Sequence, residues 1–220
     1  METALIIGAS GGIGAAVASR LQAQGVHVTG LSRSRDGLDV TDGASVDRVL
    51  GALSGPFDLI LVATGILAAP GAAPEKSLEA VDAAAMARVL AVNTIGPALI
   101  LRHVARLVPR DRRAVVGVLT ARVGSIGDNK MGGWHAYRAS KAAANQITHG
   151  AAIEIGRKRK HTIVAALHPG TVATDFTADY PGHDKVTPDQ AARNLLAVMA
   201  ALTPDQNGGF FDWAGTRVEW

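Results

Sequence analysis

Residues 3–14 read TALIIGASGGIG, and this stretch decides the fold. Residues 3–7 are a short apolar run without alternation, which is typical of a parallel strand buried on both faces. A glycine-rich turn over residues 8–14 follows, and a helical pattern continues to Gln24 and stops at Gly25. This order brings backbone amides and a helix N-terminus to one point, which suits a pyrophosphate. The glycine spacing differs from G-x-G-x-x-G, and a plain glycine-rich turn shares the local pattern.

The alternation of strands and helices continues along the whole chain. Apolar runs predict further strands at residues 26–31, 57–63, 114–119, 161–167 and 209–213, and helical patterns separate most of them. With 220 residues and 48% hydrophobic content, the chain is long enough for one sizeable core. It shows no repeat and no linker. We therefore expect one α/β domain over residues 1–220, built as a Rossmann-type, doubly wound parallel sheet.

The charge balance is slightly basic, with a net charge of +3 and a pI near 9.5. The basic residues concentrate at residues 110–113 and 157–161. Each run follows a helical pattern and precedes a strand, so its cations complement a helix C-terminus and stay solvated. We expect no nucleic-acid partner.

The absence of cysteine fits a reducing compartment, and we expect a cytoplasmic protein. The seven histidines show no metal-ligand spacing, so no metal site is predicted. Residues 1–9 are too short, and lack the basic start, for a secretory signal. The longest apolar stretches are strand-length or are interrupted by Gly, Pro or charge, which predicts no membrane span.

The end of the second predicted strand bears on the choice of dinucleotide. In such folds this strand end faces the adenosine ribose, where an acid binds the 2′-hydroxyl and an arginine accommodates a 2′-phosphate. Here the acid is absent and Arg33 is present, which favours NADP(H) over NAD(H), although exposed loop arginines are common. Asp39 is available to accept a hydrogen bond from an adenine amine, and Asp42 is placed to cap a helix beginning at Gly43.

Tyr137 and Lys141 are spaced as a proton-transfer pair. If the segment that carries them is helical, positions i and i+4 lie on one face, so the ammonium group reaches the phenol. A nearby positive charge lowers the pKa of a phenol toward neutrality, so that Tyr137 can exchange a proton at working pH. The same spacing also arises by chance in surface helices. Asn93 lies inside another helical pattern, where it either bends the helix or uses its amide to hold something.

In the order of these motifs the chain resembles the short-chain dehydrogenase/reductase family, from Leu5 to its C-terminus. Gly8-x-x-x-Gly12-x-Gly14 is similar to the family's cofactor turn, and Asn93 matches its helix asparagine. Tyr137 and Lys141 match its catalytic pair, and Pro169-Gly170 with Thr174 its nicotinamide loop. Ala63-Thr64-Gly65 stands where the family usually has Asn-Asn-Ala-Gly, so its asparagines are missing. Residues 122–129, 137–141 and 208–220 resemble the subgroup of C-factor and sniffer carbonyl reductases.

The resemblance implies hydride transfer between a nicotinamide and a small-molecule carbonyl or alcohol, with Tyr137 as general acid or base. Lys141 would also bind the nicotinamide ribose, and Asn93 would hold a water that returns a proton through Lys141. The residues expected to bind the cofactor are Gly8, Ser10, Gly11, Gly12, Ile13, Gly14, Arg33, Asp39, Val40, Ala63, Thr64, Gly65, Tyr137, Lys141, Pro169, Gly170, Val172 and Thr174. Family habit suggests a homodimer or homotetramer through the helices that carry Asn93 and Tyr137.

One departure from the family concerns the hydroxyl that holds the substrate oxygen. The family places a serine just after the strand that precedes the tyrosine helix, roughly 13 residues before the tyrosine. Here that strand ends in Thr120-Ala121, and the nearest serine, Ser125, lies 12 residues before Tyr137. The distance in sequence to Tyr137 favours Ser125 as the residue that holds the substrate oxygen. The position at the strand end favours Thr120. The departure also leaves open a second function, an NADP(H)-binding regulatory or signalling protein with little turnover.

The substrate pocket is expected between residues 125–134 and 175–187. Its apolar side chains, Met131, Trp134, Phe176 and Tyr180, either face the substrate or pack the loops. The second segment is short, which suggests an open pocket and modest selectivity.

Overall fold

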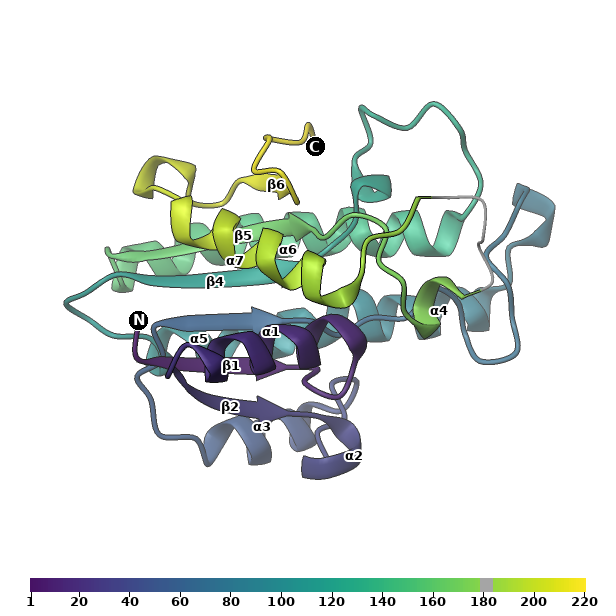
Figure 1. Cartoon of the computed structure of the whole chain (residues 1–220). Coiled ribbons are helices and arrows are strands. Elements are labelled where there is room, and N and C mark those ends of the chain that lie inside the picture. Colours follow the sequence, from purple (N-terminus) through teal and green to yellow (C-terminus); the bar gives the residue numbers. More distant parts are fainter. Residues whose placement is uncertain (179–183) are drawn as a thin grey trace.

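The structure, a computed structural model, describes residues 1–178 and 184–220 (Figure 1). Within these residues six parallel strands form one sheet in the order β2-β1-β3-β4-β5-β6. The strands are β1 Thr3–Ile7, β2 His27–Leu31, β3 Leu59–Val62, β4 Ala114–Leu119, β5 Thr162–His168 and β6 Phe210–Asp212. Every ladder between neighbouring strands is parallel. The predicted doubly wound α/β fold is confirmed.

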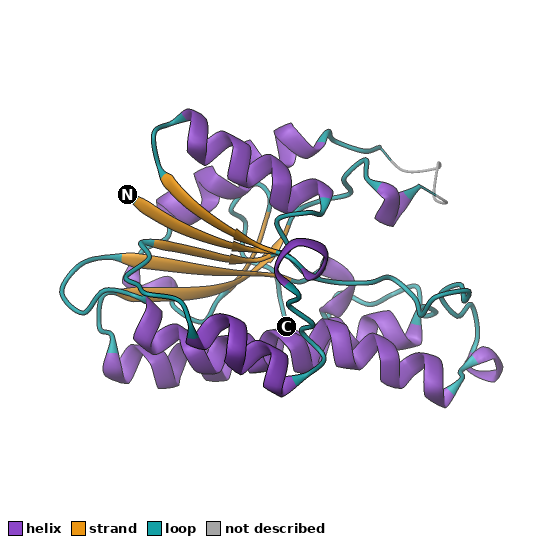
Figure 2. Cartoon of the chain, turned by 90° about the horizontal axis from the view of Figure 1, so that it is seen from below, coloured by secondary structure: helices purple, strands orange, loops and turns teal. Residues whose placement is uncertain are grey.

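Helices cover both faces of the sheet, and Figure 2 shows the strands between two helical layers. The α-helices are α1 Gly12–Ala23, α2 Arg33–Asp36, α3 Gly43–Gly51, α4 Ala83–Leu90, α5 Gly96–Leu107, α6 His135–Lys158 and α7 Pro188–Ala201. Short 3₁₀ turns are η1 Leu78–Ala80, η3 Arg122–Gly124, η4 Asp175–Thr177 and η5 Pro204–Gln206, and η2 Ala91–Ile95 is π-helical. Asp42 caps α3 as predicted, because its side chain accepts a hydrogen bond from Ala44 N at 3.0 Å.

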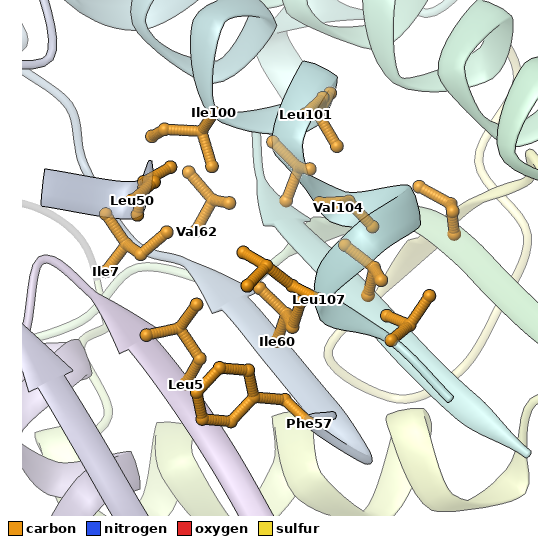
Figure 3. Close-up of a cluster of buried hydrophobic side chains, with 14 of the residues drawn as sticks. Leu5, Ile7, Leu50, Phe57, Ile60, Val62, Ile100, Leu101, Val104 and Leu107 are labelled. Atoms are coloured by element: carbon orange, nitrogen blue, oxygen red, sulfur yellow. The ribbon is translucent and has the colours of Figure 1, made fainter. Parts of the chain in front are cut away.

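Two apolar clusters, one on each face, hold the layers together. On one face, side chains of α3, α5 and α6 pack on alternate residues of β1, β3 and β4, and Figure 3 shows Leu5, Ile60 and Leu107 in this cluster. On the other face, side chains of α1 and α7 pack on the remaining strand residues. Leu5, Ile6 and Ile7 of β1 have no exposed surface, since both of its faces are covered. This double burial explains the unbroken apolar run in the sequence.

The strand order places the expected ligand crevice. β1 pairs with β2 on one side and with β3 on the other, so the connections leave β1 in opposite directions. In open parallel sheets ligands bind outside the carboxyl ends of the strands at such a reversal. The glycine-rich turn follows β1 at this point.

The sequence predicts a helical pattern from Leu78 to Leu107 with a break at residues 93–97, and the structure shows no break there. α4, η2 and α5 follow one another without interruption, and Gly96 N bonds to Ala91 O across the π-helical turn. Pro97 has no N–H and its ring crowds the carbonyl four residues earlier, that of Asn93. Widening the turn relieves this clash without ending the helix.

The continuous helix Ala83–Leu107 also bears on the expectation that nothing spans a membrane. The helix has 25 residues and contains an 18-residue window with a mean hydropathy of 1.6, so by length and composition alone it could cross a membrane. That test is weak for a single helix. Here α5 places Ile100, Val104 and Leu107 in the core between helix and sheet.

Candidate active site

The glycine-rich turn is shaped by close approaches of its backbone. Gly8 has φ 92°, in the left-handed region, and its N–H donates to Leu31 O of β2 at 2.8 Å. A Cβ on Gly8 would lie 2.7 Å from Ala63 O, and one on Gly14 would lie 2.2 Å from Gly8 O. No side chain fits at either position, so these two glycines are required by packing.

The turn presents the N-terminus of α1 toward the crevice. Gly11 is the N-cap residue, and among the described residues no side chain caps this helix and no acid lies in its first turn. The first amides of a helix have no partner inside it and carry a partial positive charge. Gly12, Ile13 and Gly14 therefore offer amide donors to an anion, as a dinucleotide pyrophosphate requires. Ser10 is exposed beside them.

The loop after β5 contacts this turn directly. A Cβ on Gly12 would lie 2.5 Å from Thr174 Cγ2, so the methyl group of Thr174 packs against the glycine. Val172 is buried, and Gly170 has φ 79°. Pro169 and Gly170 directly follow β5. The expected nicotinamide loop and pyrophosphate turn thus lie side by side at the carboxyl ends of the strands.

The end of β2 carries the expected adenosine site. Arg33 begins α2 and is exposed, while the Ser32 side chain caps this helix by accepting from Arg35 N at 3.3 Å. Asp36 folds back to accept from Ser32 N at 2.7 Å, so a carboxylate does lie near this strand end, already bonded. Arg33 remains available to a 2′-phosphate.

Asp39 and Val40 follow the end of α2. Thr41 donates its backbone N–H and its hydroxyl to Asp39 Oδ1, at 2.9 and 2.7 Å. These hydrogen bonds hold the pKa of Asp39 below its usual value. Val40 is buried and packs near Gly96 of α5. Oδ1 of Asp39 is thus occupied by hydrogen bonds within its own turn. Its other oxygen, Oδ2, has no hydrogen bond among the described residues and is available to an adenine amine.

Tyr137 and Lys141 lie on one buried face of α6, as their spacing predicted. Lys141 Nζ is 5.7 Å from the centre of the Tyr137 ring and donates to Leu119 O at 3.1 Å, at the end of β4. Tyr137 is 7% exposed and Lys141 is 3% exposed. The helix therefore brings the ammonium group to the phenol below the carboxyl ends of the strands.

Burial controls the protonation of both groups. It raises the pKa of Tyr137, so the expectation that Lys141 would pull this pKa toward neutrality is wrong. It lowers the pKa of Lys141 to about 8. Desolvation disfavours the charged form of each side chain, which moves an acid up and a base down. Near pH 7 the phenol of Tyr137 is therefore protonated and can donate its proton. The amine of Lys141 is mostly charged and can stabilise the phenolate that forms.

Asn93 lies in the π-helical turn and is 1% exposed. Its Oδ1 accepts from Ile66 N at 2.8 Å, and its Nδ2 donates to Ile66 O at 2.8 Å and to Ser140 Oγ at 3.0 Å. The amide thus ties the loop after β3 to α6, and its side chain is not free to hold a water. Of the two roles that the sequence leaves open for Asn93, the structure shows the second, because its amide holds the loop after β3.

The loop after β3 completes the centre of the site. A Cβ on Gly65 would lie 3.3 Å from Asn93 Oδ1 and 3.4 Å from Lys141 Nζ. Gly65 therefore lies between the two side chains, and its lack of a side chain keeps this space open. Ala63 and Thr64 precede it, and Thr64 Oγ1 is buried without a hydrogen-bond partner in the described residues. A bound polar ligand would satisfy such an atom.

These features agree with the comparisons to known proteins. The family model of the short chain dehydrogenases matches residues 2–184. The chain belongs to the short-chain dehydrogenase family.

Two curated relatives and two solved structures locate the chain within this family. It is 34% identical to the 1-hydroxy-2-glutathionyl-2-methyl-3-butene dehydrogenase of Rhodococcus sp., over 100% of both chains. It is 34% identical to the C-signal of Myxococcus xanthus, covering 76% of this chain and 95% of that protein. A short-chain dehydrogenase/reductase of Burkholderia multivorans with bound NADP is 26% identical, with a TM-score of 0.85 over 100% of this chain and 99% of that one. The Sniffer carbonyl reductase of D. melanogaster, 20% identical, shares the fold with a TM-score of 0.79 over 100% of both chains. The resemblance to C-factor and sniffer proteins is confirmed.

The short-chain dehydrogenase fold leaves both hydroxyl candidates in place. Thr120 follows β4 directly, and its buried Oγ1 has no hydrogen-bond partner in the part of the chain that the structure describes. Ser125 is also buried, and its Oγ accepts from Asp128 N at 3.1 Å. Its loop is held by Trp220, whose carbonyl accepts from Gly127 N at 3.0 Å and whose ring stacks on Phe210 at 5.8 Å. Among the described residues neither hydroxyl donates a hydrogen bond, so both Thr120 and Ser125 keep an O–H to offer to a substrate oxygen.

The expected pocket side chains divide into two groups. Trp134 and Phe176 pack on Tyr137, with ring centres 6.1 and 5.9 Å from that of the phenol. Met131 is 90% exposed, so its side chain packs little on other residues. Tyr180 lies outside the described residues.

Sequence analysis missed four polar residues around this site. Ser140 receives Asn93 Nδ2, and its Oγ donates to Tyr137 O at 2.8 Å. Glu75 caps α6 from the loop after β3. Burial lowers the pKa of His168 to about 4, so its ring is neutral. Asn145 is 2% exposed, and its amide has no partner among residues 1–178 and 184–220. Position inside the Tyr137 to Lys141 motif was a usable signal for Ser140; the others depend on tertiary contacts.

A cavity of about 1000 Å³ lies at the opposite edge of the sheet, near the start of β3 and β4. Its arginines are already bonded: Arg20 and Arg193 to Asp189, Arg112 to Asp58, and Arg113 to the last carbonyls of α7. It holds none of the family's motifs. Among the described residues, no group of three His, Cys, Asp or Glu side chains is placed to hold a metal ion.

Proposed function

We propose that this chain is an NADP(H)-dependent oxidoreductase that interconverts a carbonyl compound and an alcohol, with Tyr137 as general acid and base. The observation that carries the proposal is the convergence of Lys141 Nζ, Asn93 Oδ1 and Gly65 next to Tyr137, beside an uncapped helix N-terminus. Its membership of the short-chain dehydrogenase family and the NADP bound to the Burkholderia relative support it.

The cofactor, when bound, supplies or accepts the hydride at its nicotinamide ring. In the reductive direction the substrate oxygen becomes an alkoxide, and Tyr137 donates its proton to it. The raised pKa of Tyr137 keeps this proton on the phenol until then. The hydroxyl of Thr120 or Ser125 donates a second hydrogen bond to the oxygen, which stabilises the developing charge.

Lys141 stabilises the phenolate that remains. Its ammonium group lies 5.7 Å from the centre of the Tyr137 ring, so a positive charge is next to the phenol when the proton leaves. Because burial lowers the pKa of Lys141 to about 8, the amine also releases a proton readily. A water that returns the proton would lie on the main-chain carbonyl of Asn93, since Pro97, four residues later, has no N–H to bond it.

Arg33 is assigned to the 2′-phosphate of NADP(H), because a guanidinium group pairs with phosphate through several directed hydrogen bonds. It is exposed at the end of β2. Both reaction directions need to be assayed, since the Rhodococcus relative is named a dehydrogenase of a 1-hydroxy compound with a glutathionyl group.

The test is NADPH oxidation against a panel of aldehydes, ketones and quinones, with NADP⁺ reduction by the corresponding alcohols. The Tyr137→Phe variant is the control, because it keeps the ring and loses the proton. We expect it to bind NADPH as the wild type does and to lose turnover. Wild-type turnover in Tyr137→Phe would remove Tyr137 from the mechanism.

A second candidate function is NADP(H)-dependent regulation or signalling with little turnover. The C-signal of Myxococcus xanthus, whose name denotes a signal, and the missing strand-end serine favour it. NADPH binding without oxidation of NADPH by any member of the panel would select this function. We also propose that the chain forms a homodimer or homotetramer and is cytoplasmic. Sedimentation measures the oligomeric state directly.

A further inference from the structure

Three successive residues before α6 adopt the left-handed backbone conformation. Gly132 and Gly133 have φ 65°, and Trp134 has φ 52° and ψ 41°. Glycine enters this region freely, whereas a bulky side chain is disfavoured there. The chain uses glycine at two of the three positions and tryptophan at the third. Such a departure from the backbone rule is typical of positions where the side chain serves the site.

Glu75 holds this turn from the loop after β3. Its backbone carbonyl accepts from Trp134 N at 2.5 Å, and its carboxylate Oε2 accepts from Ala136 N at 3.2 Å. Glu75 is 8% exposed, so the contact is buried. The N-cap residue of α6, Trp134, makes no side-chain cap of its own. A carboxylate next to the first amides of a helix is favourable, and Glu75 supplies it.

The fixed turn places the indole against the catalytic phenol. The Trp134 and Tyr137 ring centres are 6.1 Å apart at an interplanar angle of 69°, an edge-to-face contact. The Phe176 ring lies 5.9 Å from Tyr137 at 57°. A carbonyl oxygen about 2.7 Å from the phenol oxygen would bring the substituents of its carbon alongside these rings.

We propose that Glu75 is a positioning residue and Trp134 a specificity-determining residue of this site: the Glu75 carboxylate fixes the start of α6, directly after Trp134, so that the indole favours planar groups next to the reacting carbonyl. The inference rests on the proposed function. An edge-to-face or offset contact between two aromatic rings is favourable beyond the area that it buries, and a saturated ring lacks this contribution.

The first experiment compares benzaldehyde with cyclohexanecarbaldehyde, which carry the same carbonyl on a planar and a puckered ring. The wild type is expected to show a higher kcat/KM for benzaldehyde. Trp134→Asn removes the ring but keeps a residue that tolerates the left-handed region, and it should reduce this preference roughly 2- to 10-fold, the effect of one aromatic contact. Trp134→Phe should retain most of it, and Trp134→Gly should match Trp134→Asn. Met131→Ala, at a 90% exposed position of the same loop, is the control and should leave the preference unchanged.

The second experiment separates positioning from specificity. Glu75→Gln keeps an oxygen that accepts from Ala136 N, whereas Glu75→Ala does not. Glu75→Ala should lower kcat for both aldehydes, because the first turn of α6 carries Tyr137, and should also weaken the preference for benzaldehyde. Glu75→Gln should restore both. Equal kinetics in Glu75→Ala and the wild type would overturn the positioning role.

A binding measurement keeps the inference testable if the proposed function fails. If the wild type turns over no member of the panel described above, the oxidoreductase proposal fails, and the NADP⁺-loaded protein is titrated with each of the two aldehydes while its tryptophan fluorescence is recorded. Tighter binding of benzaldehyde that is lost in Trp134→Asn and kept in Trp134→Phe supports the role of Trp134. A preference that is the same in the wild type, Trp134→Asn and Trp134→Gly, in turnover or in binding, would refute it.

Discussion

Replacing the buried Lys141 by methionine should stabilise the protein at neutral pH while abolishing its proposed activity. The pKa of Lys141 falls from 10.5 to about 8 because the amine is buried. This shift corresponds to about 3 kcal/mol of destabilisation by the buried charge below pH 8. Lys141→Met removes this destabilisation, but it also removes the hydrogen bond to Leu119 O, which costs about 1 kcal/mol. The unfolding free energy of Lys141→Met at pH 7 should therefore be about 2 kcal/mol higher than that of the wild type.

The pH dependence of this effect follows from the direction of the shift. Between pH 8 and 10.5 the unfolded chain still binds a proton on Lys141 that the folded chain has released, so the unfolding free energy of the wild type rises with pH. From pH 8 to 9.5 the rise should be about 2 kcal/mol. Lys141→Met lacks this rise, and the two stability curves converge.

Urea unfolding at pH 7.0, 8.0 and 9.5, without added cofactor, measures both effects. Lys160→Met, at an exposed position, is the matched control and should follow the wild type. The range stops below pH 10, where tyrosines of the unfolded chain begin to ionise. Parallel curves for the wild type and Lys141→Met, or a less stable Lys141→Met at pH 7, would show that the buried charge does not cost what its burial indicates.

Other substitutions test single contacts. Arg33→Ala should weaken NADPH binding about 10- to 100-fold, the effect of losing charge-assisted hydrogen bonds, and NADH binding far less; equal loss of both would refute the 2′-phosphate assignment. Gly14→Ala, whose Cβ would lie 2.2 Å from Gly8 O, should abolish dinucleotide binding or folding. Its control is Gly51→Ala in α3, where the new Cβ meets no described atom within 4 Å and should stabilise by about 0.5–1 kcal/mol in thermal unfolding. Asn93→Ala leaves both Ile66 backbone groups unpaired and should lower the unfolding free energy by about 2–4 kcal/mol; a smaller loss would show that water replaces the amide. Comparing kcat of Thr120→Val and Ser125→Ala identifies the hydroxyl that binds the substrate oxygen, because the variant that lacks it should lose more kcat.

The strands and most helices could be predicted from the sequence because their signal is local. β1 and β4 are apolar without interruption, since both faces of each strand are covered. The spacing of Tyr137 and Lys141 likewise fixes their common helix face, whatever lies around it. These features depend on the spacing of residues within a single helix or strand, which can be read directly from the sequence.

Features that depend on distant contacts could not be predicted. Glu75 ends a stretch, residues 65–75, that is rich in glycine, proline and alanine, and its partner Ala136 lies on another element, so nothing in the local sequence indicates the contact. Arg113 was expected to complement the helix before it, yet it bonds the last carbonyls of α7. The direction of the Tyr137 pKa shift was wrong because the argument counted the neighbouring charge and not the burial of the phenol.

The contact between Trp220 and the Ser125 loop has a practical consequence for work on the purified protein. Because the Trp220 carbonyl bonds Gly127 N, a tag or reporter fused after Trp220 would start beside a loop that carries one of the two candidate substrate-binding hydroxyls. Preparations tagged at opposite ends are then expected to differ in KM while sharing one melting temperature. For kinetic measurements a tag is better attached at Met1 than at Trp220.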